Sequence, residues 1–402
     1  MAIDNKDKKV LNVPHLRFPE FSGEWVTCTL GDITSSFNLR NKDEVPYPMY
    51  SVTNNRGFIP QSEQFEDREM IGEDAKAYKI IHKDDFAYNP ARINVGSIAK
   101  YNGVHPCMIS SLYVCFKAGL QVDKDWLMQL LKTSKMNFYY NINGEGGVRV
   151  YLFYPNFARI RTSYPATLTE QKKIAHFLSL LDERIATQNK IIKDLKKLKS
   201  AISKHLFARK DLLETTICLS NIATLKNGYA FQSGKYNALG KWKILTITNV
   251  SGERYINDKD CNCIINLPND IQDHQVLKEG DILISLTGNV GRVSLCKNGD
   301  YLLNQRVGLL QLAKNVNQEF LYQILSSQKF ENSMIACGQG AAQMNIGKGD
   351  VESYVLPYSS NGNNILWVAK ILHSYDECII NEMRKLTLLT MQKQYLLIQM
   401  FI

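Results

Sequence analysis

The sequence has no apolar run close to the ~18 residues that a membrane-spanning helix needs, although 45% of its 402 residues are hydrophobic. The first ten residues, MAIDNKDKKV, are polar and charged, so we expect no secretory signal there. The charged fraction of 22% is ordinary for a soluble globular protein. We therefore expect a cytoplasmic protein with two or three domains.

Paired cysteines and grouped histidines are also missing. The nine cysteines are scattered, and Cys261 and Cys263 stand close together without a CxxC pair or a histidine partner. The seven histidines are isolated from one another. We expect buried free thiols, no metal site and no Ser/His/Asp constellation.

The motifs of nucleotide-binding and methyl-transferring enzymes are incomplete. In NIGKGD (345–350), Ala342 stands where a GxxxxGK loop has its first glycine, and no Ser or Thr follows Lys348. YNPA (88–91) lacks the second proline and the aromatic residue of the tetrapeptide used by amino-methylating DNA enzymes. The sequence therefore predicts a protein with no catalytic residues.

Positive charge is concentrated in one segment. The net charge is +9, and between Glu170 and Lys210 eleven Lys/Arg face four Asp/Glu. A solvated helix face explains such a run, and so does a basic stripe beside a phosphate backbone, with Lys196 and Lys197 as candidate contacts.

The same segment predicts a long helix with a coiled-coil seam. TLTE (167–170) fits a capping box, and apolar residues then recur in steps of four and three. The pattern returns 194 residues later, with polar members at matching places, Gln188 with Glu382 and Lys199 with Lys393. The apolar seam residues are Ile174, Leu178, Leu181, Ile185, Ile192, Leu195, Ile202, Leu206, Val368, Leu372, Tyr375, Ile379, Leu386, Leu389, Leu396 and Met400.

A predicted hairpin also occurs twice, as NVGSIAKYNG (94–103) and NVGRVSLCKNG (289–299). The repeat therefore covers half a chain. We predict an α+β fold in which two repeated domains of mixed or antiparallel β-structure with helices are joined by two long helices. These helices would form an antiparallel coiled coil with a pseudo-two-fold axis. The predicted segments are 1–20 (N-terminal), 21–165 (domain 1), 166–210 (central helix), 211–358 (domain 2) and 359–402 (C-terminal helix).

Four motifs resemble those of specificity subunits of type I restriction–modification systems. They are VPHLRFPEFSGEW (13–25), DFAYNPARINVGSIAKYNG (85–103), TEQKKIAHFLSLLDERI (169–185) and GDILISLTGNVGRVSLCKNGDYLLNQRV (280–307). The resemblance implies that domains 1 and 2 are target-recognition domains, each reading half of a split site in double-stranded DNA. It also implies that the helices dock methyltransferase and restriction (motor) subunits. S-adenosylmethionine, ATP and Mg would belong to those partners, and this subunit would bind no cofactor.

Two loops in each domain are candidates for base contacts. TGNVG, between two predicted strands, serves either as a simple hairpin turn or as a loop at the DNA edge. Glycine-rich turns at 143–150 and 337–345 would let the backbone approach a ligand, and Arg and Gln pair bidentately with G and A. The candidate DNA contacts in these loops and nearby are Arg92, Asn94, Lys100, Arg149, Thr287, Asn289, Arg292, Gln339 and Gln343.

The second copy departs from the first before its long helix. LPYSSNGNNILW (356–367) has no Glu-Gln pair and no capping box, so Asn363 or Asn364 is expected to cap the helix. This leaves open whether both ends dock a partner equally. A symmetric protein-interaction scaffold without sequence-specific DNA binding stays the alternative function.

Overall fold

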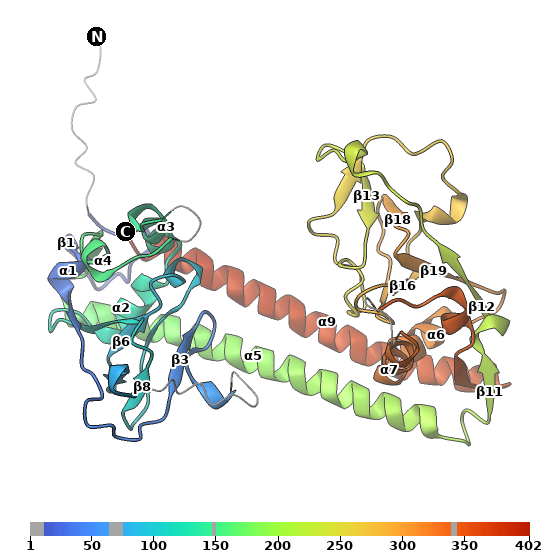
Figure 1. Ribbon diagram of the computed structural model, residues 1–402, viewed down its shortest axis with the longest axis horizontal. Coiled ribbons are helices and arrows are strands. Elements are labelled where there is room, and N and C mark those ends of the chain that lie inside the picture. The colour runs from blue at the N-terminus through green and yellow to red at the C-terminus, as the bar shows by residue number, and fades with distance from the viewer. Residues whose placement is uncertain (1–11, 64–74, 147–149, 339–343) are drawn as a thin grey trace, which may run out of the picture. The chain divides into compact units, whose positions relative to one another are not determined.

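The computed structural model describes residues 12–63, 75–146, 150–338 and 344–402. The chain divides into two compact units. Unit 1 comprises the residues up to Thr187 together with Leu386–Ile402, and unit 2 comprises Gln188–Lys385. Each unit contains a sheet-rich domain and a part of both long helices, α5 (Leu168–Ala208) and α9 (Gly362–Gln399) (Figure 1).

Unit 1 is built around a four-stranded antiparallel sheet in the order β2-β9-β6-β7, and two-stranded ladders β1-β10, β3-β4 and β5-β8 surround it. Its strands are β1 (Val26–Thr29), β2 (Thr34–Phe37), β3 (Tyr50–Thr53), β4 (Gly57–Pro60), β5 (Lys79–Ile81), β6 (Phe86–Tyr88), β7 (Ile98–Lys100), β8 (Cys107–Ile109), β9 (Val114–Ala118) and β10 (Arg161–Tyr164). Its shorter helices are α1 (Leu30–Ile33), α2 (Lys124–Leu131), α3 (Ser134–Asn143), α4 (Tyr154–Ala158) and the 3₁₀ turns η1 (Gln61–Glu63), η2 (Ala75–Ala77) and η3 (Ile93–Val95).

Unit 2 repeats this plan with the sheet β12-β19-β16-β17 and the ladder β11-β20. Its second sheet, β14-β13-β18-β15, contains the parallel pair β13–β18. Its strands are β11 (Thr215–Cys218), β12 (Ala223–Asn227), β13 (Trp242–Leu245), β14 (Asn262–Ile264), β15 (Val276–Leu277), β16 (Ile282–Ser285), β17 (Val293–Leu295), β18 (Tyr301–Leu303), β19 (Val307–Leu312) and β20 (Val355–Tyr358). Its shorter helices are α6 (Gln318–Leu325), α7 (Gln328–Cys337), α8 (Lys348–Glu352) and the turns η4 (Leu219–Asn221), η5 (Ser233–Lys235) and η6 (Asp273–Gln275).

The helix starts show why both halves fold alike. Asp123 caps α2 and Asn317, 194 positions later, caps α6 through the same kind of side-chain acceptor. Thr133 and Ser327 do the same for α3 and α7. Oxygen-bearing side chains satisfy the free N–H groups of a first helical turn, so these four residues begin equivalent helices at equivalent places.

Each unit buries its domain core against its own part of the helix pair. In unit 1, Leu178 of α5 and Leu396 of α9 share a core with Trp126 and Phe86. In unit 2, Leu206 of α5 and Leu372 of α9 join the core of that domain. The beginning of α5 thus meets the end of α9 in unit 1, and the end of α5 meets the beginning of α9 in unit 2, so the helices pair antiparallel. The predicted α+β class with long helices joining two sheet-rich domains is confirmed.

The hairpin predicted around TGNVG (287–291) is also confirmed, because β16 pairs antiparallel with β17 and Ile284 lies opposite Val293. Its glycines adopt the conformation that the turn requires. Gly291 has φ +78°, and its counterpart Gly96 in unit 1 has φ +99°, a left-handed region that side chains rarely enter.

One expectation about the helix starts is wrong, and the other is confirmed for one of its two hydrogen bonds. Asn361, rather than Asn363 or Asn364, caps α9, since its Oδ1 accepts the N–H of Asn363 at 3.0 Å. At α5, Thr167 Oγ1 accepts the N–H of Glu170 at 3.4 Å, as the capping box predicts. The Glu170 carboxylate, however, accepts hydrogen bonds from Arg17 Nε at 2.7 Å and from Nη2 at 2.8 Å. Its charge therefore forms an ion pair with a residue far away in the sequence.

All nine cysteines are free thiols, but only three of them, Cys107, Cys115 and Cys296, are buried. Burial raises the pKa of each of these three to about 12, so the thiols stay protonated at neutral pH. In the part of the chain that the structure describes, no helix is long and apolar enough to cross a membrane.

Candidate functional site

The two candidate loops of unit 1 lie against each other. Leu152, which follows the glycine-rich turn, donates its backbone N–H to the carbonyl of Pro90 at 3.0 Å. Asn94 in the hairpin loop donates from Nδ2 to Asn141 Oδ1 of α3 at 3.0 Å. Segments about 50 residues apart in sequence therefore form one surface, which we call loop surface 1 (the described residues 89–97, 134–146 and 150–153).

Unit 2 repeats the arrangement as loop surface 2 (the described residues 285–292 and 344–347). Ile346 donates its backbone N–H to Leu286 O at 2.9 Å, and these residues correspond to Leu152 and Pro90 in the repeat. Gly288 N donates to Met344 O at 2.9 Å, and Thr287 Oγ1 donates to Asn345 Oδ1 at 3.1 Å. The same backbone hydrogen bond therefore joins the hairpin loop to the glycine-rich turn in both units.

The predicted DNA contacts of unit 1 differ in how exposed their side chains are. Arg92 is exposed and precedes η3, while Asn94 is half-buried. Lys100 lies on β7, where its ammonium forms ion pairs with Asp84 and Asp125 and its side chain is 10% exposed. Because two carboxylates already compensate the charge of Lys100, we expect it to attract an anionic ligand less strongly than Arg92 does.

On loop surface 2, Asn289 is exposed and Thr287 is half-buried. The Nε atom of Arg292 lies 3.3 Å from Glu331 Oε1 on α7, and its side chain is 39% exposed. This contact leaves part of the guanidinium directed away from the acid. Arg149, Gln339 and Gln343 lie outside the described residues.

A polar junction fastens each sheet-rich domain to the helices. In unit 1, Gln129 of α2 donates to Asp182 of α5 at 3.1 Å, and Asp182 pairs with Lys393 of α9. In unit 2, Gln323 of α6 donates to Asp376 of α9 at 2.6 Å, and Asp376 pairs with Lys199 of α5 at 2.6 Å. The glutamine, the aspartate and the lysine of one junction each correspond to those of the other at an offset of 194 residues. Each triad holds a domain helix to both long helices.

The junction of unit 2 carries an additional arginine that the sequence did not indicate. Arg254, 7% exposed at its side chain, contacts Asp376 at 2.9 Å and Glu319 at 2.6 Å. Burial alone would raise the pKa of Glu319, but the hydrogen bonds from Arg254 and Gln323 hold that pKa below its usual value. Arg254 bridges the two acids, and together with Lys199 it balances their two negative charges.

Comparison with known proteins finds similar sequences and similar folds. Residues 214–391 match the family model described as type I restriction modification DNA specificity domain. The chain is also 30% identical over 202 residues to the type I restriction enzyme MjaVIII specificity subunit of Methanocaldococcus jannaschii, a match of 44% of this chain and 46% of that protein. The chain thus spans about half the length of this curated relative.

Solved structures extend the likeness to the whole fold. The S subunit of a type I restriction–modification system from M. genitalium has a TM-score of 0.59 at 15% identity and covers 97% of this chain and 99% of its own. A second solved structure bears on the complex assembly and conformational transition of the type I restriction–modification system. It has a TM-score of 0.57 at 14% identity and covers 96% of this chain and 98% of its own. At such identities these matches establish a shared fold. The resemblance to type I specificity subunits is confirmed.

The helix pair of this type I specificity fold buries the predicted seam. All sixteen apolar seam positions are buried or half-buried, and so are the polar members Gln188, Lys199, Glu382 and Lys393. Gln188 donates from Nε2 to the Glu382 carboxylate at 2.5 Å and to its carbonyl at 3.0 Å. Lys196 and Lys197 lie on the outer side of α5, where Lys196 pairs with Glu253 at 2.7 Å and Lys197 is exposed.

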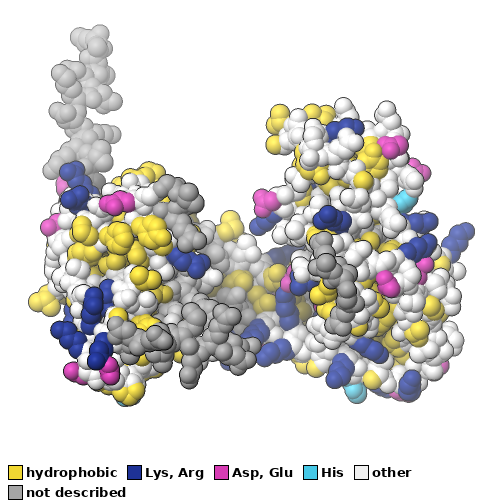
Figure 2. Space-filling model, viewed as in Figure 1, with side chains coloured by type: hydrophobic (Ala, Val, Ile, Leu, Met, Phe, Trp, Pro, Cys, Tyr) yellow, Lys and Arg dark blue, Asp and Glu magenta, His cyan; other side chains and the backbone are white. Residues whose placement is uncertain are grey.

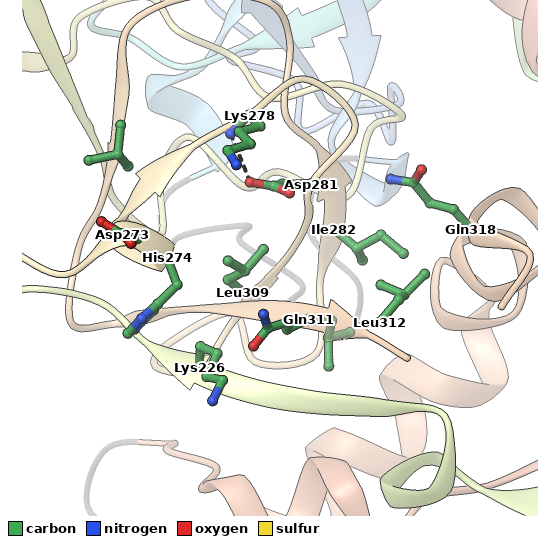
Figure 3. Close-up of a pocket in the computed structure, with 12 residues that line it drawn as sticks. Lys226, Asp273, His274, Lys278, Asp281, Ile282, Leu309, Gln311, Leu312 and Gln318 are labelled. Atoms are coloured by element: carbon green, nitrogen blue, oxygen red, sulfur yellow. Dashed lines mark hydrogen bonds between the residues drawn. The ribbon is translucent and has the colours of Figure 1, made fainter. Parts of the chain in front are cut away.

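A pocket of about 490 Å³ in unit 2 has no part in either loop surface. Figure 3 shows that the amino groups of Lys226 and Lys278 and the ring of His274 point in different directions around it. Burial raises the pKa of Asp281, which accepts the backbone N–H of Lys278 at 2.8 Å. The pocket therefore offers no set of convergent donors. Among the described residues there is also no group of three or more His, Cys, Asp or Glu that could hold a metal ion.

Proposed function

We propose that this chain is the DNA-recognition subunit of a type I restriction–modification complex. Domain 1 (residues 21–165) and domain 2 (residues 211–358) each read one half of a bipartite site in double-stranded DNA. The observation that carries the proposal is the repeated loop surface, in which the hydrogen bonds of Leu152 to Pro90 and of Ile346 to Leu286 join the same two loops in both units. A protein that reads two half-sites needs two equivalent reading surfaces.

The loop surfaces have the chemistry that base recognition uses. Arg92 and Arg292 provide guanidinium donors, and Asn94 and Asn289 provide amides that pair with base edges. Loops on a rigid sheet place such groups accurately, because the strands that flank them are buried and hydrogen-bonded. Exposed lysines of α5 such as Lys197 supply sequence-independent attraction to the phosphate backbone.

The remaining parts of the proposal concern partners. The helix pair docks methyltransferase and restriction subunits, which bring S-adenosylmethionine, ATP and Mg. This chain does no chemistry itself and binds no cofactor, and the complex acts in the cytoplasm, where the host DNA lies. The family of residues 214–391 and the shared fold of the whole chain support this assignment.

Sequencing of methylated bases in the host genome tests the proposal. Deletion of this gene should remove one bipartite methylated motif, and restoring the gene should restore it. Exchange of residues 21–165 for those of a related protein should change one half of the motif and leave the other half intact. An unchanged methylation pattern after deletion would favour a protein scaffold without sequence-specific DNA binding.

A further inference from the structure

Large apolar side chains stand exposed on loop surface 1. Val95, Phe138, Ile142, Tyr151 and Phe153 have exposed fractions of 54%, 60%, 58%, 38% and 49%. Hydrophobic side chains also gather visibly on this unit in the space-filling view (Figure 2). On a soluble protein, exposed apolar residues are usually scattered singly. A group of them that includes aromatic residues therefore marks a binding surface.

These side chains belong to three separate pieces of chain that hydrogen bonds join. Val95 follows Asn94, whose amide donates to Asn141 on α3, the helix that carries Phe138 and Ile142. Tyr151 and Phe153 flank Leu152, the residue bonded to Pro90. The segments that carry the aromatic residues are therefore hydrogen-bonded to the hairpin loop, which carries Arg92 and Asn94.

The rings lie against other aromatic rings. Tyr151 and Phe153 are stacked, with ring centroids 6.3 Å apart and an interplanar angle of 11°. Phe138 lies 5.9 Å from Tyr139 on the same helix, and Lys135 lies over the Tyr139 ring.

The repeat shows that the fold does not require these rings. The positions in unit 2 that correspond to Phe138, Ile142, Tyr151 and Phe153 hold Asn332, Ala336, Asn345 and Gly347. Unit 2 forms the equivalent helix α7 and the equivalent loop contact with these small or polar residues. The aromatic side chains of loop surface 1 therefore serve a role that is particular to domain 1.

The surroundings favour a nucleic acid as the ligand. Arg92 and Lys135 supply positive charge beside the rings, and Asn94 and Asn141 supply amides. The nearby carboxylate of Glu145 accepts Asn156 Nδ2 at 2.7 Å, so one of its oxygens is engaged within the protein. Aromatic residues among cations and amides are typical of surfaces that contact bases as well as phosphates.

We propose that Phe138, Tyr151 and Phe153 form an apolar wedge that presses against a base step in the half-site read by domain 1. The inference rests on the proposed DNA-recognition function and adds a mode of reading to it. A wedge between base pairs unstacks them and bends the duplex, and the cost is lowest at flexible pyrimidine–purine steps. Domain 1 therefore reads DNA deformability at this step, whereas domain 2, with Asn332 and Gly347 there, does not.

The test uses the complete complex with its methyltransferase subunits and duplexes that contain the methylated motif. The wedge variant is Phe138→Ala with Phe153→Ala, the matched control is Asn332→Ala on α7, and the aromatic-conserving variant is Phe153→Tyr. Affinity is measured by anisotropy, bending by energy transfer between the duplex ends, and unstacking by 2-aminopurine placed at each step of both half-sites. Complex assembly and thermal melting are recorded for every variant.

We expect the wedge variant to assemble and melt like the wild type but to bind its site about 5- to 150-fold more weakly, a ratio that corresponds to ~1–3 kcal/mol for one stacked base. Its bend should decrease, and the 2-aminopurine signal should fall only in the domain 1 half-site. Asn332→Ala and Phe153→Tyr should behave like the wild type. Unchanged affinity and bending would overturn the wedge, and so would a loss of methyltransferase binding by a folded variant, which would make the patch a protein contact. If the wild-type complex itself did not bind the motif, the proposed function would fail instead.

Discussion

Lys199 Nζ lies 2.6 Å from Asp376 Oδ1 in the helix pair of unit 2. The repeat gives the same pair in unit 1, where Lys393 contacts Asp182. Each lysine occupies a seam position of one long helix, and each aspartate lies on the other helix and also accepts from a domain glutamine. Charged side chains therefore join the long helices to each other and to each domain, in addition to the apolar seam.

The first prediction compares the two aspartates. Asp376 is 8% exposed at its side chain and pairs with both Lys199 and Arg254. Asp376→Asn removes the buried negative charge that pairs with these cations and leaves them uncompensated. The free energy of unfolding should therefore fall by about 3–5 kcal/mol. The side chain of Asp182 is 45% exposed, and Asp182→Asn should cost only about 0–1 kcal/mol. Urea titration followed by circular dichroism measures both.

The matched control is Asp194→Asn, which removes an exposed acid from α5 without touching the junction. It should leave the urea midpoint unchanged. Equal losses for Asp376→Asn and Asp182→Asn would show that burial does not decide the strength of the junction.

The second prediction concerns Gln188 and Glu382, which correspond to each other in the repeat and are hydrogen-bonded. Polar groups in a seam limit stability but fix the register of the helices. The double variant Gln188→Leu with Glu382→Leu should therefore be at least as stable as the wild type. Its methylated motif should show more than one spacer length, because an all-apolar seam tolerates a shifted register. A single unchanged spacer in a stable double variant would mean that other contacts fix the register.

The elements that repeat locally could be predicted from the sequence. The seam follows from apolar residues in steps of four and three, and the hairpin follows from alternating residues around Gly288 and Gly291. Each of these signals lies within a few neighbouring residues, and the second copy of the chain supports each of them. The family resemblance depends on the same local motifs.

The junctions could not be predicted, because their members are far apart in sequence. Arg254 meets Asp376 across 122 residues, and Arg17 meets Glu170 across 153. In the sequence Glu170 fits a capping box, yet its carboxylate holds Arg17. The joining of the two loops of each loop surface was missed for the same reason, although the similar spacing of these loops in both halves was a usable signal.

The third prediction follows from the pKa of Asp258. Hydrogen bonds from Lys243 at 2.8 Å and Lys297 at 3.1 Å hold that pKa well below the usual 3.8. A lowered pKa in the folded state stabilises the protein above pH 3.8, and this contribution disappears as the pH falls through the lower folded value. Asp258→Asn should therefore destabilise unit 2 at pH 5–8, and the difference from the wild type should shrink below pH 4.

Urea midpoints between pH 2.5 and pH 8 measure this difference. The control is Asp260→Asn, a nearby exposed acid, which should give a pH profile parallel to that of the wild type. A difference between wild type and Asp258→Asn that stays constant down to pH 2.5 would contradict the lowered pKa.

The last prediction separates base contacts from phosphate contacts. Arg292 lies on loop surface 2, and Lys197 lies exposed on α5. Arg292→Ala should weaken binding of the cognate site by about 1–3 kcal/mol and relax one position in the half-site read by domain 2. Lys197→Ala should weaken all sequences alike and reduce the slope of log affinity against log salt by about one unit if the lysine meets a phosphate.

The ion pair of Arg292 with Glu331 supplies the control for this comparison. Glu331→Gln removes the acid 3.3 Å from Arg292 Nε without removing the guanidinium, so the preferred sequence should be retained while affinity stays equal or increases. The measurement is binding of the complete complex to a library of half-site variants at three salt concentrations. If Arg292→Ala and Lys197→Ala gave the same sequence-independent loss, Arg292 would contact only the phosphate backbone, and the bases of that half-site would be read by other residues of loop surface 2.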